Sequence, residues 1–112
     1  MVAIVTPLTI TSETAGDTLL VQLWGELDYT SAGILKEEFD LADARFAPRH
    51  ARLDLAGVRH LDATGLGLLV AIAKRLRARD GELRLLNVTP EAMEVLELTG
   101  LGDALGASAE AA

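Results

Sequence analysis

The amino-acid sequence predicts an α/β domain, in which a small mixed, mostly parallel sheet of four to five strands has helices packed mainly on one face. Short apolar or alternating runs, typical of strands, alternate with longer runs in which apolar residues recur at helical spacing. A glycine-aspartate turn joins the first two strand patterns as an antiparallel hairpin. The later strand patterns are separated by helices, which favours right-handed crossovers and parallel pairing. A length of 112 residues predicts one domain over 1–112.

The hairpin and the first helix are predicted from the N-terminal half of the chain. Leu8 and Ile10 alternate with threonines, Gly16-Asp17 is a turn pattern, and a second strand runs from Leu19 to Trp24. A helix then begins at Thr30 or Ser31, either of which could provide the cap, and Pro48 ends it. Its expected apolar positions are Leu35, Phe39, Ala42 and Phe46.

The centre of the chain predicts a buried strand, a loop and an apolar helix in succession. The strand covers Arg52 to Val58, the loop runs from Arg59 to Thr64, and the helix runs from Gly65 to Arg79. Asp80-Gly81 ends the helix, since glycine accepts the left-handed conformation beyond the last turn. The expected core positions of this helix are Leu66, Leu69, Val70 and Ala73.

The C-terminal part predicts one more strand and one more helix. The strand covers Glu82 to Asn87, and Thr89-Pro90-Glu91 is a helix start with a capping threonine and a proline at the first position. Thr99-Gly100 ends that helix. We expect the domain core over residues 8–105 and a frayed, flexible tail over Gly106 to Ala112. The inward positions of the helix are expected to be Met93, Val95 and Leu96.

Composition and charge argue against several classes of protein. The absence of cysteine excludes disulfides and thiolate chemistry, and a net charge of −7 argues against binding to nucleic acid. The basic cluster at Lys74, Arg75, Arg77 and Arg79 is explained as solvated cations at a helix C-terminus. The run Met1 to Pro7 is too short for a signal peptide, and no run reaches the roughly 20 apolar residues of a membrane span. We therefore expect a cytoplasmic protein without membrane insertion.

The pattern of polar residues also argues against catalysis. His50 and His60 do not fit a nucleophile arrangement or a metal-ligand set, and no G-x-S-x-G elbow is present. Gly65-Leu-Gly67 lacks the third glycine and the acidic residue of a dinucleotide-binding motif. We expect no enzymatic activity, no metal and no cofactor.

Polar residues gather where the predicted strands end. The loops Asp28 to Ser31, Arg59 to Thr64 and Asn87 to Pro90 follow strands whose carboxyl ends share one edge of the sheet. Thr64 or Asp62 could cap the helix that follows, and a phosphate on the Thr64 hydroxyl would add a charge of about −1.5 to −2. Gly65 and Gly67 are interpreted as sites of close backbone packing or of approach by a partner, and Leu68 as an exposed anchor.

Five segments in register resemble a STAS domain of the anti-sigma factor antagonist family. They are Gly25-Glu-Leu-Asp28, Leu53-Asp-Leu-Ala-Gly-Val58, Leu61-Asp-Ala-Thr-Gly-Leu-Gly67, Gly81-Glu-Leu-Arg-Leu-Leu-Asn87 and Leu96-Glu-Leu-Thr-Gly-Leu101. The resemblance implies an unphosphorylated form that binds an anti-sigma factor with a kinase-like ATP-binding domain and so frees a sigma factor. It also implies that phosphorylation breaks the complex and that a phosphoprotein phosphatase restores it.

The resemblance assigns residues as well as a function. The phosphoacceptor position of the family falls on Thr64, with Asp28 and Asp62 as the neighbouring acids. The sequence departs from the family in having Ala63 where serine is usual and threonine where the acceptor is more often serine. The expected partner-binding residues are Asp28, Tyr29, Thr30, Asp62, Ala63, Thr64, Gly65 and Leu68.

Two other functions remain open from the sequence. The departures at Ala63 and Thr64 favour a STAS subunit or scaffold of a larger lipid-transport or stress-signalling complex, in which Thr64 is never phosphorylated. A small-molecule or nucleotide sensor that uses the same loops has no dedicated motif in the sequence.

Overall fold

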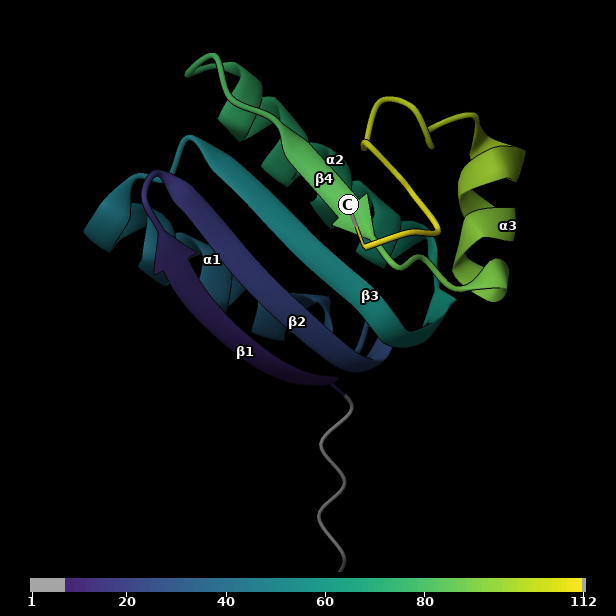
Figure 1. The fold of residues 1–112 in the computed structure, drawn as a ribbon. Helices are drawn as coiled ribbons and strands as arrows, with labels where there is room; N and C mark the ends of the chain where they lie inside the picture. Colours follow the sequence, from purple (N-terminus) through teal and green to yellow (C-terminus); the bar gives the residue numbers. More distant parts are fainter. Residues whose placement is uncertain (1–7, 112) are drawn as a thin grey trace, which may run out of the picture.

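The computed structural model describes residues 8–111, which form four strands and three helices (Figure 1). Their order is β1 (Leu8–Ala15), β2 (Thr18–Leu27), α1 (Ala32–Phe46), β3 (His50–Leu61), α2 (Ala63–Arg77), β4 (Leu83–Leu86) and α3 (Pro90–Thr99). The predictions for Met1 to Pro7 and for Ala112 lie outside the described residues. Within residues 8–111, no helix combines the length and the apolar character needed to cross a bilayer.

The four strands of the described part form one mixed sheet in the order β1-β2-β3-β4. β1 pairs antiparallel with β2, whereas β2 with β3 and β3 with β4 pair parallel. The predicted mixed, mostly parallel sheet is thereby confirmed. The parallel strands end at one edge, so the segments that follow β2 and β3 lie next to each other.

β3 is longer than its hydrophobic pattern indicates. Between the partners of Gln22 and Trp24, and again between those of Gly25 and Glu26, β3 contains one residue more than β2. These bulges let the strand continue to Leu61 although its alternation of buried and exposed residues is broken. The predicted loop from Arg59 to Thr64 is therefore wrong: Asp62 alone separates β3 from α2, which begins at Ala63 rather than Gly65.

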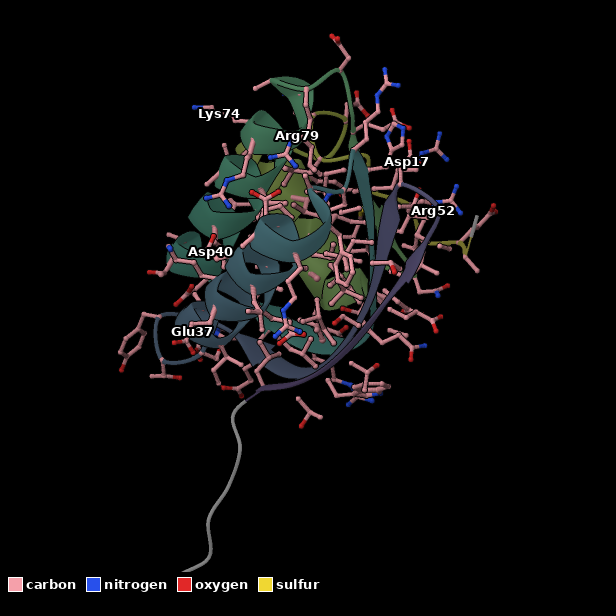
Figure 2. The ribbon with its side chains drawn as sticks, turned by 90° about the vertical axis from the view of Figure 1, so that its left-hand side faces the viewer. Asp17, Glu37, Asp40, Arg52, Lys74 and Arg79 are labelled. Atoms are coloured by element: carbon pink, nitrogen blue, oxygen red, sulfur yellow. The ribbon has the colours of Figure 1, made fainter. Side chains whose placement is uncertain are left out.

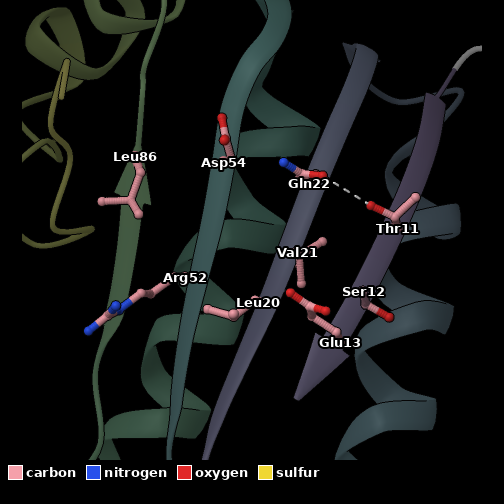
Figure 3. A pocket seen from close by; sticks show the side chains of 9 residues that line it. All are labelled: Thr11, Ser12, Glu13, Leu20, Val21, Gln22, Arg52, Asp54 and Leu86. Atoms are coloured by element: carbon pink, nitrogen blue, oxygen red, sulfur yellow. Dashed lines mark hydrogen bonds between the residues drawn. The ribbon is translucent and has the colours of Figure 1, made fainter. Parts of the chain in front are cut away.

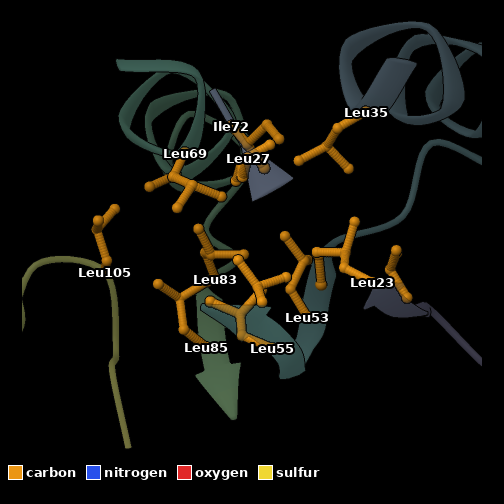
Figure 4. Packing of buried hydrophobic residues seen from close by; sticks show 14 of the residues in the cluster. Leu23, Leu27, Leu35, Leu53, Leu55, Leu69, Ile72, Leu83, Leu85 and Leu105 are labelled. Carbon is orange, nitrogen blue, oxygen red and sulfur yellow. The ribbon is translucent and has the colours of Figure 1, made fainter. Parts of the chain in front are cut away.

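Helices α1 and α2 lie on the same face of the sheet, as Figure 2 shows, and α3 packs against β3. Apolar side chains fill the space between the helices and the sheet (Figure 4). Leucine is the main component of this core, and the fully buried members include Leu23, Leu53, Leu55, Leu69 and Leu85. The opposite face of the sheet carries exposed side chains, among them Arg52 in Figure 2.

Some residues expected in the core are not buried there. Phe46 is 59% exposed at the last position of α1. Val70, Met93 and Val95 are only partly buried at the margin of the core. Leu96 is fully buried, as its spacing predicts.

The C-terminal segment pairs with β4 instead of fraying. The amide of Leu85 donates to the carbonyl of Gly106, and the amide of Ser108 donates back to the carbonyl of Leu85, at 3.1 and 2.9 Å. The amide of Asn87 donates to the carbonyl of Glu110. The prediction of a frayed tail from Gly106 onwards is therefore wrong for residues 106–110, which cover the outer edge of β4.

Ion pairs join α1 to α2 and to the residues that follow α2. Arg75 contacts Asp40 at 2.8 Å, and Arg79 contacts Asp43 at 2.6 Å. The guanidinium of Arg75 also lies 5.2 Å from the centre of the Phe39 ring. The prediction that these cations are simply solvated is therefore wrong for both arginines, because α1 presents acidic residues along its contact with α2.

Candidate functional site

The carboxylate of Asp62 connects the two segments that follow β2 and β3. Its Oδ1 accepts a hydrogen bond from the amide of Gly65, so Asp62 is the N-cap of α2. Its Oδ2 accepts from the amide of Tyr29, which lies between β2 and α1; both distances are 2.9 Å. Of the two possible caps in the sequence, the structure therefore selects Asp62 over Thr64, and it gives the same side chain a second role.

Asp28 organises the segment before α1. Its Oδ1 accepts hydrogen bonds from the Thr30 hydroxyl at 2.6 Å and from the Thr30 amide at 2.9 Å. These bonds, chiefly that of the hydroxyl, lower the pKa of the Asp28 carboxyl below its ordinary value, despite the opposing effect of its desolvation. Because Asp28 and Asp62 bind the adjacent amides of Thr30 and Tyr29, two carboxyl groups lie at one short segment.

Ser31 is a structural residue of the site that the sequence did not identify as such. It is fully buried, its hydroxyl donates to the carbonyl of Glu26 at 2.5 Å, and it accepts from the amide of Asp28 at 3.0 Å. It makes no side-chain cap of α1, although its position at the helix start is as predicted. A small hydroxyl residue three positions after an aspartate is the sequence signal that fits this turn.

Gly65 brings α2 against the end of β2. A Cβ atom at this position would lie 2.3 Å from the carbonyl oxygen of Leu27, so a side chain has no room. The close packing predicted for Gly65 is confirmed. Gly67 is different, because a Cβ atom there would meet nothing within 4 Å.

The exposed side chains of the site surround the two carboxylates. Thr64 is the second residue of α2 and is exposed, and its hydroxyl makes no hydrogen bond to another residue within 8–111. Tyr29 is 77% exposed, and Thr30 and Ala63 are exposed as well. We call the surface formed by Tyr29, Thr30, Asp62, Ala63 and Thr64, together with the buried Asp28, the acidic edge.

Leu68 does not belong to the acidic edge, contrary to the prediction. It is half-buried and packs against the core, so the expectation of an exposed anchor is wrong. It lies more than one helical turn beyond Thr64, where α2 packs against the sheet.

The third predicted loop, Asn87 to Pro90, has its polar groups engaged elsewhere. The Thr89 hydroxyl caps α3 by accepting from the amide of Ala92, and it donates to the carbonyl of Val58 at 2.6 Å. The amide of Val88 donates to the carbonyl of Ser108. This loop therefore anchors α3 to β3, and in the described part of the chain no hydrogen bond links it to Asp28 or Asp62.

The histidines lie apart from this surface. His50 accepts a hydrogen bond from the amide of Glu82 at the other end of the sheet, at 3.2 Å, and His60 is exposed on β3. Among residues 8–111, no group of three or more histidine, aspartate or glutamate side chains is arranged to hold a metal ion. The chemistry available at the acidic edge is that of an accessible hydroxyl beside two aspartates.

The chain is similar to known bacterial regulators in sequence. The model of the STAS domain matches residues 9–110. The chain is 30% identical over 83 residues to the anti-sigma F factor antagonist of Paenibacillus polymyxa, covering 74% of this chain and 71% of the relative. It is 32% identical over 90 residues to the anti-sigma-B factor antagonist of Bacillus subtilis, covering 80% and 81%.

Solved structures have the same fold. The anti-sigma factor antagonist SpoIIAA in its unphosphorylated form matches with a TM-score of 0.77 at 24% identity, over 89% of this chain and 88% of that one. The phosphorylated form of SpoIIAA from Bacillus matches with a TM-score of 0.70 at 24% identity, over 89% and 91%. At these identities the likeness establishes the arrangement of strands and helices.

Proposed function

Because the chain belongs to the STAS domain family, we propose that it is a cytoplasmic anti-sigma factor antagonist, switched off by phosphorylation at Thr64. Its unphosphorylated acidic edge binds an anti-sigma factor that is also an ATP-dependent kinase, and this binding releases a sigma factor. A phosphoprotein phosphatase restores the binding form. The protein is a substrate of both enzymes and catalyses no step itself.

The observation that carries the proposal is the exposed hydroxyl of Thr64 at the start of α2. The amides of Ala63 and Thr64 donate no hydrogen bond within residues 8–111, so a phosphate on Thr64 would find free donors and the positive end of the helix dipole. The fold therefore tolerates the modification. Since Asp62 holds the helix start through Gly65, the cap remains intact when the hydroxyl is modified.

The effect of the phosphate falls on the partner instead. A partner surface that packs against the neutral hydroxyl of Thr64 would have to cover a phosphate charge of about −1.5 to −2 without a counter-charge placed for it. A coupling of about 3 kcal/mol changes affinity by roughly 150-fold, which is sufficient for a switch.

Binding experiments with Thr64 variants test the switch. We expect Thr64→Ala to bind a kinase-type anti-sigma factor from the protein's own cell as the wild type does, whereas Thr64→Asp weakens binding at least about tenfold by calorimetry. Thr14→Asp is the matched control, because Thr14 is exposed on β1 at the opposite end of the sheet. Equal affinities of Thr64→Asp and Thr64→Ala would contradict the proposal.

The modification itself is tested by intact-mass measurement. Incubation with the same anti-sigma factor and ATP is expected to add one phosphate to the wild type and none to Thr64→Ala. A protein that binds but never gains the phosphate, in vitro or when isolated from its cell under different growth conditions, would instead support the scaffold function.

A further inference from the structure

The face of the sheet that the helices leave uncovered carries a specific order of side chains. Along β2, the buried Val21 and Leu23 face the helices, and Leu20, Gln22 and Trp24 therefore face outward. Figure 3 shows this face with the helices behind it. A shallow hollow of about 340 Å³ lies on it, with Leu20 and Leu86 among its lining residues.

The strand register arranges these side chains in rows across the sheet. Glu13 pairs with Leu20, Leu20 with Arg52, and Arg52 with Arg84, so one row has an acid on β1 and two arginines on β3 and β4. The next row, in the same order, is Thr11, Gln22, Asp54 and Leu86. The first row is therefore acidic at its β1 end and basic at its β4 end. The second row is polar at its β1 end and apolar at its β4 end.

We propose that this face, which we call the outer face, binds the outer face of a second copy of the chain. A two-fold axis parallel to the strands, between β2 and β3, exchanges β1 with β4 and keeps each row at the same height. Glu13 then lies opposite Arg84 of the second copy, and Gln22 lies opposite Asp54 of the second copy. These two contacts are complementary in charge and in hydrogen bonding, as an isologous interface requires, whereas Leu20 lies opposite Arg52 and Thr11 opposite Leu86 of the second copy.

The single tryptophan supports the same axis. Trp24 is 44% exposed and lies over Gly57, where a Cβ atom would be 2.5 Å from its Cδ1. Gly57 belongs to β3, so the indole leans toward the line between β2 and β3. In the proposed pair the two indoles meet at the axis and remove apolar surface from water.

The size of the face predicts a weak association. Eight residues on each of β1, β2 and β3 and the four residues of β4, at about 3.3 Å per residue and about 4.8 Å between strands, make a flat area of roughly 450 Å² per copy. The total of roughly 900 Å² is slightly below the usual size of specific interfaces, in the range of weak ones. Arg84 also contacts Glu82 of its own chain at 3.2 Å, which competes with the intermolecular pair. The association is therefore expected at high protein concentration.

Charge reversal in two separate variants tests the arrangement. Sedimentation equilibrium of the full chain at concentrations up to several hundred micromolar is expected to show a monomer-dimer equilibrium. Glu13→Arg and Arg84→Glu each place like charges at both symmetric contacts, so each is expected to raise the Kd about tenfold or more. An equimolar mixture of the two variants is expected to recover the association, because each contact then joins an arginine on one copy to a glutamate on the other.

A control variant distinguishes this interface from a general effect of surface charge. Glu94→Arg makes the same charge reversal at an exposed position of α3 and is expected to associate as the wild type does. Circular dichroism establishes that each variant is folded, and the fluorescence of Trp24 is expected to shift with association. A wild type that stays monomeric, reversals without effect on the Kd, or a mixture that fails to recover would each overturn the proposal. The proposal goes beyond the antagonist function, and none of these measurements involves an anti-sigma factor.

Discussion

Asp62 joins the start of α2, which carries the proposed phosphorylation site, to the proposed binding surface. One of its oxygens fixes the start of α2 at Gly65, and the other fixes the backbone of Tyr29, 33 residues away in the chain. Thr64 follows two residues later on the first turn of the same helix. A change of charge at Thr64 therefore acts on a surface whose two halves are already held together.

The two glycines of α2 give the first prediction at the residue scale. We expect Gly65→Ala to destabilise the fold by about 2 kcal/mol, since the new Cβ would press on the backbone carbonyl of Leu27 and force α2 away from β2. Gly67→Ala has open space and is expected to stabilise the helix by about 0.5 to 1 kcal/mol.

Urea unfolding of the two variants measures this difference. Because both substitutions add the same methyl group to the same helix, helix propensity alone would move both midpoints upward. A Gly65→Ala protein as stable as Gly67→Ala would contradict the close approach of α2 to Leu27.

Part of the site could be predicted from single residues, and part could not. The exposure of Thr64 at a helix start follows from its place after a buried strand and an N-capping acid, which are local signals. The bond between Asp62 and Tyr29 depends on the adjacency of β2 and β3, which no local pattern specifies. The burial of Ser31 depends on the same packing, because its hydroxyl bonds to the end of β2.

At the scale of elements, strong local signals predicted what the structure contains. The hairpin turn at Gly16-Asp17 and the start of α3 at Thr89-Pro90 are found where they were expected. The boundary of β3 was wrong because bulges extend the strand through residues whose pattern resembles a loop. The pairing of residues 106–110 with β4 was missed because a small, polar sequence gives no sign of a tertiary partner.

The C-terminal segment gives a prediction at this scale. Gly106 has a φ of +59°, and a Cβ atom there would lie 2.6 Å from the carbonyl oxygen of Leu83. We expect Gly106→Ala to separate residues 106–110 from β4 and to cost about 2 kcal/mol, through backbone strain and steric overlap. Gly102→Ala is the control, since a Cβ atom at that position has open space.

Hydrogen exchange reports on the separation directly. The amides of Leu85, Asn87 and Val88 donate to residues 106, 110 and 108, so all three are expected to exchange faster in Gly106→Ala. Unchanged exchange at these amides would show that the segment is not held by Gly106. An exposed β4 edge is also expected to promote aggregation, because it presents unpaired backbone groups.

For the whole molecule, the two surfaces have different chemistry and lie in different places. The acidic edge is formed where β2 and β3 end, and the outer face lies opposite α1 and α2. A pair formed through the outer faces leaves the carboxyl ends of both sheets at its rim. The proposed self-association and the proposed binding of an anti-sigma factor are therefore compatible in one assembly.

The stability of the whole molecule is expected to fall in acid. Hydrogen bonds from Thr30 lower the pKa of Asp28, and those from Lys36 and Arg75 lower the pKa of Asp40. Carboxyls with lowered pKa values in the folded state stabilise it above the pKa of the unfolded chain, near 3.8, and this contribution is lost as the pH falls through the folded values. We expect the free energy of unfolding to decrease below about pH 5.

Asp28→Asn and Asp40→Asn should each flatten that decrease in urea titrations at a series of pH values. Because the two residues belong to separate hydrogen-bond networks, their effects are expected to add; a double variant with the full acid sensitivity of the wild type would contradict this origin.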